Sequence, residues 1–165
     1  MHDPNAAAGI SELTCTVYVL SKFIVIPGWL LLVASLFMPR WRRSLWPITQ
    51  FVVPALLSLL YLLMVWDGRA GFHEYGWKTF FRIEGINELY NYWSALNAGW
   101  LHFLAVDLFA ATCVVRDGLA RRMPVVAILI CLPLIMMLAP AGLLLYFALR
   151  YAFRSRAPAA EPEAA

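Results

Sequence analysis

The stretch 48–66, ITQFVVPALLSLLYLLMVW, decides the fold class because it contains no charged residue and is long enough to cross a lipid bilayer. A transmembrane α-helix needs about 20 consecutive, predominantly apolar residues. Pro47 suits the first position of such a helix, and the charged Asp67 marks the exit into water. We therefore interpret this stretch as a membrane-spanning helix.

Three further apolar runs have similar lengths and cover residues 13–37, 95–115 and 124–149. Pro27 in the first run, and Pro133 and Pro140 in the last, predict kinks. The run 95–115 is expected to end in a turn at residues 116–118. Because 62% of all residues are hydrophobic and only 14% are charged, a water-soluble globule is excluded. The sequence predicts an all-α polytopic membrane protein with a four-helix transmembrane bundle.

The segment 67–92, between the second and third runs, mixes charged side chains with many aromatic rings. Amphipathic aromatic residues concentrate at the depth of the lipid headgroups. We expect one or two short helices lying in the membrane interface and folded over the mouth of the bundle. Glu84 and Glu88 in this segment are interpreted as solvated carboxylates that could also line an entrance.

Residues 1–156 are predicted to form a single four-helix membrane domain, and residues 157–165, APAAEPEAA, a disordered tail. The N-terminus has no basic region of the kind that precedes a cleaved signal, so the first helix is expected to stay. The cysteines, at positions 15, 113 and 131, have neither the number nor the spacing of a disulfide framework.

The formal net charge of +3 does not indicate a nucleic-acid partner, because the arginines cluster beside the apolar runs as membrane flanks do. With four crossings the basic residues divide equally between the two faces, so their distribution does not fix the orientation. We favour a cytoplasmic location for both short basic loops. The two equal sets are Arg40, Arg42, Arg43, Arg116, Arg121 and Arg122 on one face, and Arg69, Lys78, Arg82, Arg150, Arg154 and Arg156 on the other.

Asp107 lies inside an apolar run, where an ionised carboxylate costs at least about 2.5 kcal/mol. Two interpretations remain open. The carboxyl could give and take a proton near neutral pH, or it could form an ion pair with Lys22 in the first run and have no chemical role.

His102 precedes Asp107 by five residues, which places the two side chains about 140° apart on an ideal helix. The histidine could act as an acid or base together with Asp107 through a bound substrate. It could also ligate the metal of a pigment, since Ala98 and Gly99 would leave room for a flat macrocycle, or simply donate to a backbone carbonyl. No histidine spacing typical of a di-iron site occurs, so we expect no metal site and leave the cofactor unknown.

The stretch 100–111, WLHFLAVDLFAA, followed by Asp117-Gly118-Leu119, resembles the abscisic-acid-deficient-four-like membrane family. The stretch 138–146, LAPAGLLLY, is similar to the last helix of that family. The resemblance implies a four-helix membrane protein. In plants it implies a plastid protein needed to convert violaxanthin into neoxanthin, a rearrangement of an epoxide into an allene.

Such a rearrangement requires a proton donor and a base but no net redox change, and the resemblance therefore implies roles for particular residues. Asp107 and His102 would be the acid/base pair, and Trp100 and Phe109 would pack against a polyene. The residues that would tune a pKa or join the binding set are Lys22, Glu84 and Asn97.

The chain lacks a plastid transit peptide and has an alanine-rich, arginine-over-lysine composition that is typical of bacteria, so the plant substrate cannot be carried over. We expect a bacterial inner-membrane protein that acts on a carotenoid or related isoprenoid. The alternatives are a non-catalytic pigment-binding or assembly subunit, and a small transporter with a proton relay. The expected partners are the lipid bilayer and the isoprenoid ligand, and either a homo-oligomer or a larger membrane complex is compatible with so small a bundle.

Overall fold

The structure is a computed structural model that describes residues 10–69 and 80–153. Within these residues the fold is all-α, and four long helices are apolar enough to cross a membrane. They are α1 (Glu12–Phe37), the continuous helix Pro39–Asp67, α6 (Trp93–Ala120) and α7 (Val125–Ala152). The predicted fold class, a polytopic membrane protein built as a four-helix bundle, is confirmed.

The second long helix changes its winding along its length. It begins as η2 (Pro39–Trp41) and α2 (Arg42–Pro47), passes through the π-turn η3 (Ile48–Val52), and ends as α3 (Val53–Asp67). The π-turn directs the polar side chains of Thr49 and Gln50 into the protein, where Thr49 Oγ1 lies 3.2 Å from Thr112 Oγ1 of α6. Thr49 Oγ1 also lies 3.3 Å from the carbonyl oxygen of Trp46, and Thr112 Oγ1 donates to that of Leu108 at 2.9 Å, so both buried hydroxyls are paired within the bundle.

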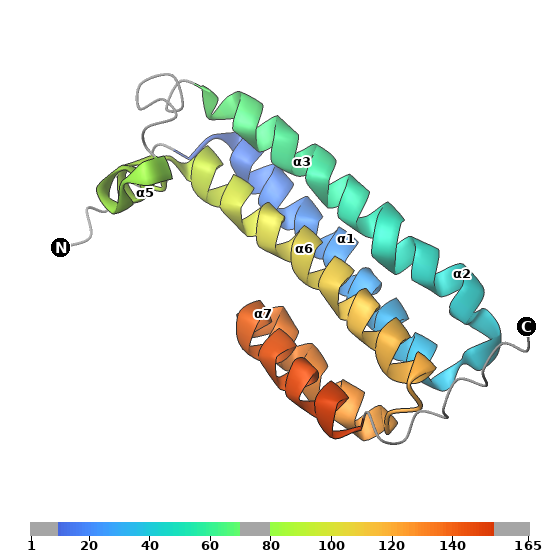
Figure 1. The fold of residues 1–165 in the computed structure, drawn as a ribbon. Coiled ribbons are helices and arrows are strands. Elements are labelled where there is room, and N and C mark those ends of the chain that lie inside the picture. Colours follow the sequence, from blue (N-terminus) through green and yellow to red (C-terminus); the bar gives the residue numbers. More distant parts are fainter. Residues whose placement is uncertain (1–9, 70–79, 154–165) are drawn as a thin grey trace, which may run out of the picture.

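Helix α6 lies at the centre, and α1 and α3 pack along it (Figure 1). Gly28 lets α1 approach closely, because a Cβ atom there would lie 2.8 Å from Leu108 Cδ2 on α6. Small residues at helix contacts are typical of membrane bundles. Leu32, Leu57, Leu101 and Leu108 are fully buried where these helices meet.

The segment between α3 and α6 contains the short helix α5 (Ile83–Leu89), which lies at the end of the bundle where α6 begins (Figure 1). Residues 70–79 of the predicted interfacial segment lie outside the described residues, as do residues 1–9 and the predicted disordered tail 157–165. Helix α6 continues to Ala120, so the turn predicted at residues 116–118 is wrong and the chain reverses only after Arg121.

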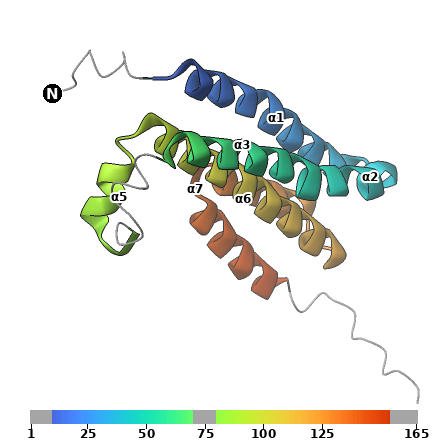
Figure 2. The same ribbon diagram turned by 90° about the horizontal axis from the view of Figure 1, so that it is seen from above.

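Helix α7 has the predicted kink, which is sharp enough to fold the helix back on itself. Leu138 leaves the helical conformation, with φ −146° and ψ 68°. Pro140, two residues later, has no N–H to donate and its ring collides with the carbonyl of residue 136, which explains the break. The two halves lie side by side against α6 (Figures 1 and 2).

Candidate functional site

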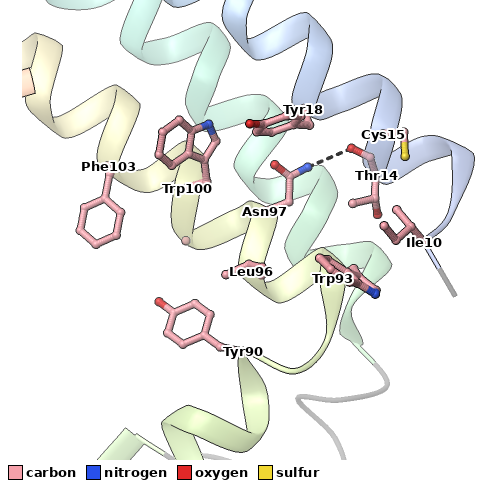
Figure 3. A pocket seen from close by; sticks show the side chains of 11 residues that line it. Ile10, Thr14, Cys15, Tyr18, Tyr90, Trp93, Leu96, Asn97, Trp100 and Phe103 are labelled. Atoms are coloured by element: carbon pink, nitrogen blue, oxygen red, sulfur yellow. Dashed lines mark hydrogen bonds between the residues drawn. The ribbon is translucent and has the colours of Figure 1, made fainter. Parts of the chain in front are cut away.

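An aromatic pocket of about 680 Å³ lies between α1, α5 and the first half of α6 (Figure 3). A volume of this size is typical of sites for small organic ligands. Several of the rings are partly exposed on the outer surface of the bundle, so the pocket opens towards lipid. Its lining residues are Ile10, Thr14, Cys15, Tyr18, Tyr90, Trp93, Leu96, Asn97, Gly99, Trp100 and Phe103.

The walls of the pocket are set by contacts between three segments. The rings of Tyr18 on α1 and Trp100 on α6 lie 6.4 Å apart. Tyr90, directly after α5, packs over Gly99, where a Cβ atom would lie 2.8 Å from Tyr90 Cε1. The absence of a side chain at Gly99 lets this ring lie directly on α6, and a larger residue there would have to displace the end of the Tyr90 side chain.

Asn97 and Thr14 are buried polar residues of the pocket, each with 6% of its surface exposed. Asn97 donates through Nδ2 to the backbone oxygen of Thr14 at 3.2 Å and points to Met64 Sδ at 3.4 Å. Its Oδ1 has no hydrogen-bond partner among the described residues. A buried acceptor without a donor costs about 1–3 kcal/mol, so this oxygen is an unsatisfied polar atom directly behind the wall of the pocket.

Asp107 lies on the same face of α6 as the pocket, at a deeper level. Leu96, Trp100, Phe103 and Asp107 follow one another at intervals of four, three and four residues, which keeps them on one side of a helix. The Asp107 side chain is buried and makes no hydrogen bond or ion pair within residues 10–69 and 80–153. Asp107 thus places an unpaired carboxyl one helical turn beyond Phe103, the last residue of α6 that lines the pocket.

The predicted pair of Lys22 and Asp107 is not formed in this structure. Lys22 is exposed, and its Nζ lies 4.0 Å from the ring centroid of Tyr18, a pocket residue. His102 is also exposed and points to the α3 side, where its ring centroid lies 6.2 Å from that of Tyr61. The structure thus places His102 and Asp107 on different sides of α6, as the predicted angle requires.

The remaining predicted residues divide between the pocket and the surface. Trp100 and Asn97 both line the pocket. Phe109 follows Trp100 by nine residues, which places it on the opposite face of α6, with 42% of its surface exposed. Glu84 on α5 is exposed and lies 3.9 Å from Arg82 Nε. Neither Phe109 nor Glu84 contributes to the pocket.

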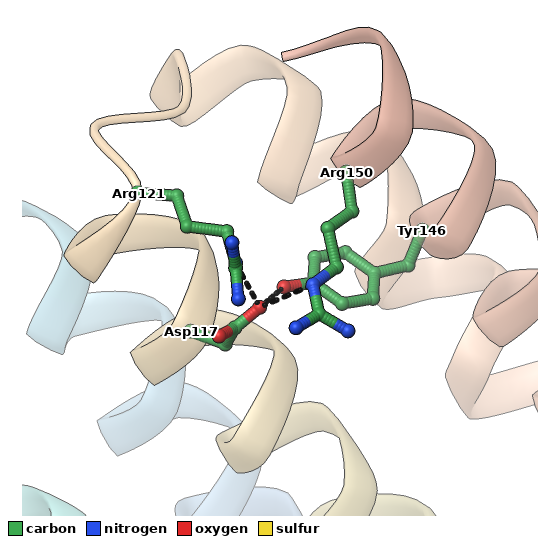
Figure 4. Close-up of polar contacts among 4 residues, drawn as sticks. All are labelled: Asp117, Arg121, Tyr146 and Arg150. Carbon is green, nitrogen blue, oxygen red and sulfur yellow. Dashed lines mark hydrogen bonds and ion pairs between the residues drawn. The ribbon is translucent and has the colours of Figure 1, made fainter. Parts of the chain in front are cut away.

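A polar cluster holds the other end of α6 (Figure 4). Asp117 Oδ2 accepts hydrogen bonds from Arg121 Nε at 2.8 Å and from the hydroxyl of Tyr146, and it forms an ion pair with Arg150, whose Nε lies 3.2 Å away. The hydrogen bond with Asp117 raises the pKa of Arg121 above its ordinary value, so this guanidinium stays charged. We call these four residues the Asp117 cluster.

Two groups of residues were missed by the sequence analysis. The rings of Tyr18, Tyr90 and Trp93 come from segments far apart in sequence, and no local pattern predicts that they meet. Asp117 was read only as part of a turn, although its place four residues before Arg121 allows the observed pair. In the described part of the chain, no group of histidine, cysteine and acidic residues is arranged to hold a metal ion.

Together, the four long apolar helices and the lateral aromatic pocket define an integral membrane protein with a cavity on the side of its bundle. The chain belongs to the family described as ABA DEFICIENT 4-like, whose sequence profile matches residues 16–146. It is therefore a membrane protein of a carotenoid-related family, and the family match extends through both N-terminal long helices. No curated protein and no solved structure matches the chain.

Proposed function

We propose that the chain binds a carotenoid or related isoprenoid in the aromatic pocket and rearranges it by acid/base chemistry. The observation that carries the proposal is the pocket itself, which is walled by rings, open to lipid and backed by the buried amide of Asn97. An extended apolar ligand gains free energy by packing against aromatic surfaces. Such a ligand reaches the pocket by diffusing in the bilayer, so no entrance from water is needed.

Asn97 is the proposed anchor for a polar end group. Its Nδ2 is held by the Thr14 carbonyl, which leaves Oδ1 directed away from that bond. A hydroxyl on the ring of a carotenoid would donate to this oxygen once a rotation of the amide brings it to the surface of the pocket. A hydrocarbon end group would leave the oxygen unpaired, so the pocket is expected to prefer hydroxylated carotenoids.

Asp107 is the proposed proton-transfer group. It lies ten residues beyond Asn97 on α6, which corresponds to about 15 Å along the helix axis. An extended molecule anchored at Asn97 reaches this level, so the reacting atoms would lie part-way along the polyene. In an isomerisation the protonated carboxyl gives its proton to one ligand atom, and the carboxylate takes a proton from another. The electron count of the ligand does not change. His102 faces away from the pocket and is assigned no contact with the ligand.

The test uses a carotenoid-producing bacterial host that expresses the wild-type chain, Asp107→Asn or the control Glu84→Gln. We expect a new carotenoid with unchanged mass in cells with the wild type and the control. Asp107→Asn should abolish this product while the protein still co-purifies with pigment. The same product from Asp107→Asn would refute the catalytic role.

A second candidate is a pigment-binding subunit without catalytic activity. It is favoured by the composition of the pocket wall, since the residues that line it include no carboxylate and no imidazole. This alternative predicts that pigment co-purifies with the wild type and Asp107→Asn equally, and that the carotenoids of the host are unchanged in both.

A further inference from the structure

Helix α7 ends at the same end of the bundle where it begins. Its start follows directly after α6, beyond Arg121. Near its end, Tyr146 and Arg150 both reach back to Asp117, close to the last turn of α6 (Figure 4). Asp117 therefore ties the C-terminal part of α7 to the end of α6 from which α7 starts, which is incompatible with a helix that leaves on the far side.

The two halves of α7 are too closely packed and too short to cross the bilayer in sequence. A Cβ atom on Gly142 would lie 2.5 Å from the backbone nitrogen of Ile135, although residues seven apart in a straight helix are separated by about 10 Å. Each half, before and after Leu138, has about 13 residues and a length of about 20 Å. The hydrocarbon core is about 30 Å thick.

We propose that α7 is a re-entrant hairpin, which enters the membrane and leaves it from the same face. Of the four helices that are apolar enough to span the membrane, three then cross it, namely α1, the continuous helix Pro39–Asp67, and α6, and the fourth enters without crossing. Glu12, where α1 begins, and Ala152, where α7 ends, lie on opposite sides of the membrane. This arrangement requires only the observed fold and is independent of the proposed activity.

The hairpin also changes the charge balance of the two faces. With the end of α7 beside the end of α6, the described residues place seven arginines at this end of the bundle and two at the other. We call the end with seven arginines the basic face. Its arginines are Arg40, Arg42, Arg43, Arg116, Arg121, Arg122 and Arg150, and those of the opposite face are Arg69 and Arg82.

The acidic residues strengthen this asymmetry. Asp117 is the acidic residue described at the basic face, whereas Glu12, Asp67, Glu84 and Glu88 lie at the opposite end. Short loops rich in Lys and Arg remain in the cytoplasm, where the leaflet carries anionic lipids. The basic face is therefore the surface that contacts anionic phospholipid headgroups on the cytoplasmic side. The aromatic pocket lies in the opposite half of the membrane.

The test labels single cysteines with a membrane-impermeant maleimide. In a background with Cys15, Cys113 and Cys131 replaced by alanine, one variant carries Ser44→Cys at the basic face and another Asn91→Cys at the opposite face; both positions are exposed. A third has a cysteine appended after the last residue. Bacterial spheroplasts and inverted inner-membrane vesicles are compared, and detergent-solubilised protein gives the total label.

We expect the appended cysteine to react from the same side as Ser44→Cys, in inverted vesicles only, and Asn91→Cys to react in spheroplasts. Reaction of the appended cysteine from the side of Asn91→Cys would overturn the hairpin. Reaction of Ser44→Cys in spheroplasts would overturn the cytoplasmic assignment. If the cysteine-free background does not fold, the wild-type chain is fused at its C-terminus to a fluorescent protein that folds only in the cytoplasm. This fusion tests on which side of the membrane α7 ends. Fluorescence is expected, and its absence at normal expression contradicts the proposal.

Discussion

Asn97 and Asp117 are the two polar residues on which the arrangement depends most directly, because each is shared between segments that are distant in sequence. Asn97 joins α6 to the first turn of α1, and its buried Oδ1 has no partner among the described residues. Asp117 joins the last turn of α6 to the C-terminal part of α7 and to Arg121 in the connection between them. Substitution of Asn97 therefore tests the recognition of the ligand, and substitution of Asp117 tests the attachment of α7 to α6.

Asn97→Leu is expected to remove the preference for hydroxylated carotenoids. A buried acceptor without a donor costs about 1–3 kcal/mol, and about 1.4 kcal/mol corresponds to a tenfold ratio. The ratio of hydroxylated to hydrocarbon carotenoid that co-purifies should therefore fall about tenfold. Chromatography of the extracted pigment measures this ratio, with Asn87→Leu on the exposed side of α5 as the control. An unchanged ratio in Asn97→Leu would exclude Asn97 as the anchor.

Asp117→Asn is expected to lower the free energy of unfolding by about 1–2 kcal/mol. Hydrogen bonds to charged groups contribute about 1.5–3 kcal/mol, and the side chain is 37% exposed, so solvent reduces the loss. Thermal unfolding in mild detergent measures it. The control is Glu84→Gln, whose pair with Arg82 is exposed and long, and whose midpoint should not change. Equal midpoints for Asp117→Asn and the wild type would show that the cluster does not hold α7.

At the scale of single elements, α7 is the helix whose shape depends most on sequence detail. Pro140 breaks it, and Gly142 lets the two halves meet without a side chain between them. The close approach involves the backbone of Ile135, which cannot move aside as the end of a side chain can. The hairpin therefore depends on glycine at position 142.

Gly142→Ala is expected to destabilise the protein by about 1–3 kcal/mol, because overpacking forces the two halves of α7 apart. Gly28→Ala is the matched control. A Cβ atom there would meet side-chain atoms rather than backbone, namely Leu108 Cδ2 at 2.8 Å and Val53 Cγ1 at 3.1 Å, and alanine gains about 0.5–1 kcal/mol in helix propensity, which offsets part of the cost. Thermal unfolding of the two variants in the same detergent should show a clearly larger loss for Gly142→Ala. A loss of equal size in both would contradict the hairpin contact.

The elements themselves could be predicted from the sequence, because hydropathy and the demand for paired backbone groups in lipid leave few alternatives to helices. Pro140 allowed the kink in α7 to be predicted. The fold-back could not be predicted, because it depends on the close contact between Gly142 and the backbone of Ile135, which a proline kink by itself does not imply. Asp107 and Asn97 were found as polar residues in an apolar run. The pocket rings were not found, because exposed aromatic residues of α1 and α5 are equally typical of membrane interfaces.

At the scale of the whole molecule, α7 covers one half of a face of α6, and the aromatic pocket occupies the other half of the same face. Towards the basic face, Gly118 packs against Ile128 of α7. Counting along the helices from this contact, the tip of the hairpin reaches about the level of Asp107. Beyond it the same face of α6 carries Phe103 and Trp100, which α7 does not cover. The short hairpin therefore leaves the pocket open to lipid, with Asp107 at the boundary.

The most direct test of this account is the amount of carotenoid that co-purifies when the pocket is filled by a larger side chain. Leu96→Trp places an indole in the pocket, and Leu62→Trp adds the same group to the exposed surface of α3, near the level where Met64 meets Asn97. Overpacking costs about 1–3 kcal/mol, so pigment bound per protein should fall about tenfold in Leu96→Trp and stay at the wild-type level in Leu62→Trp. Equal pigment in both variants would contradict the assignment of the pocket.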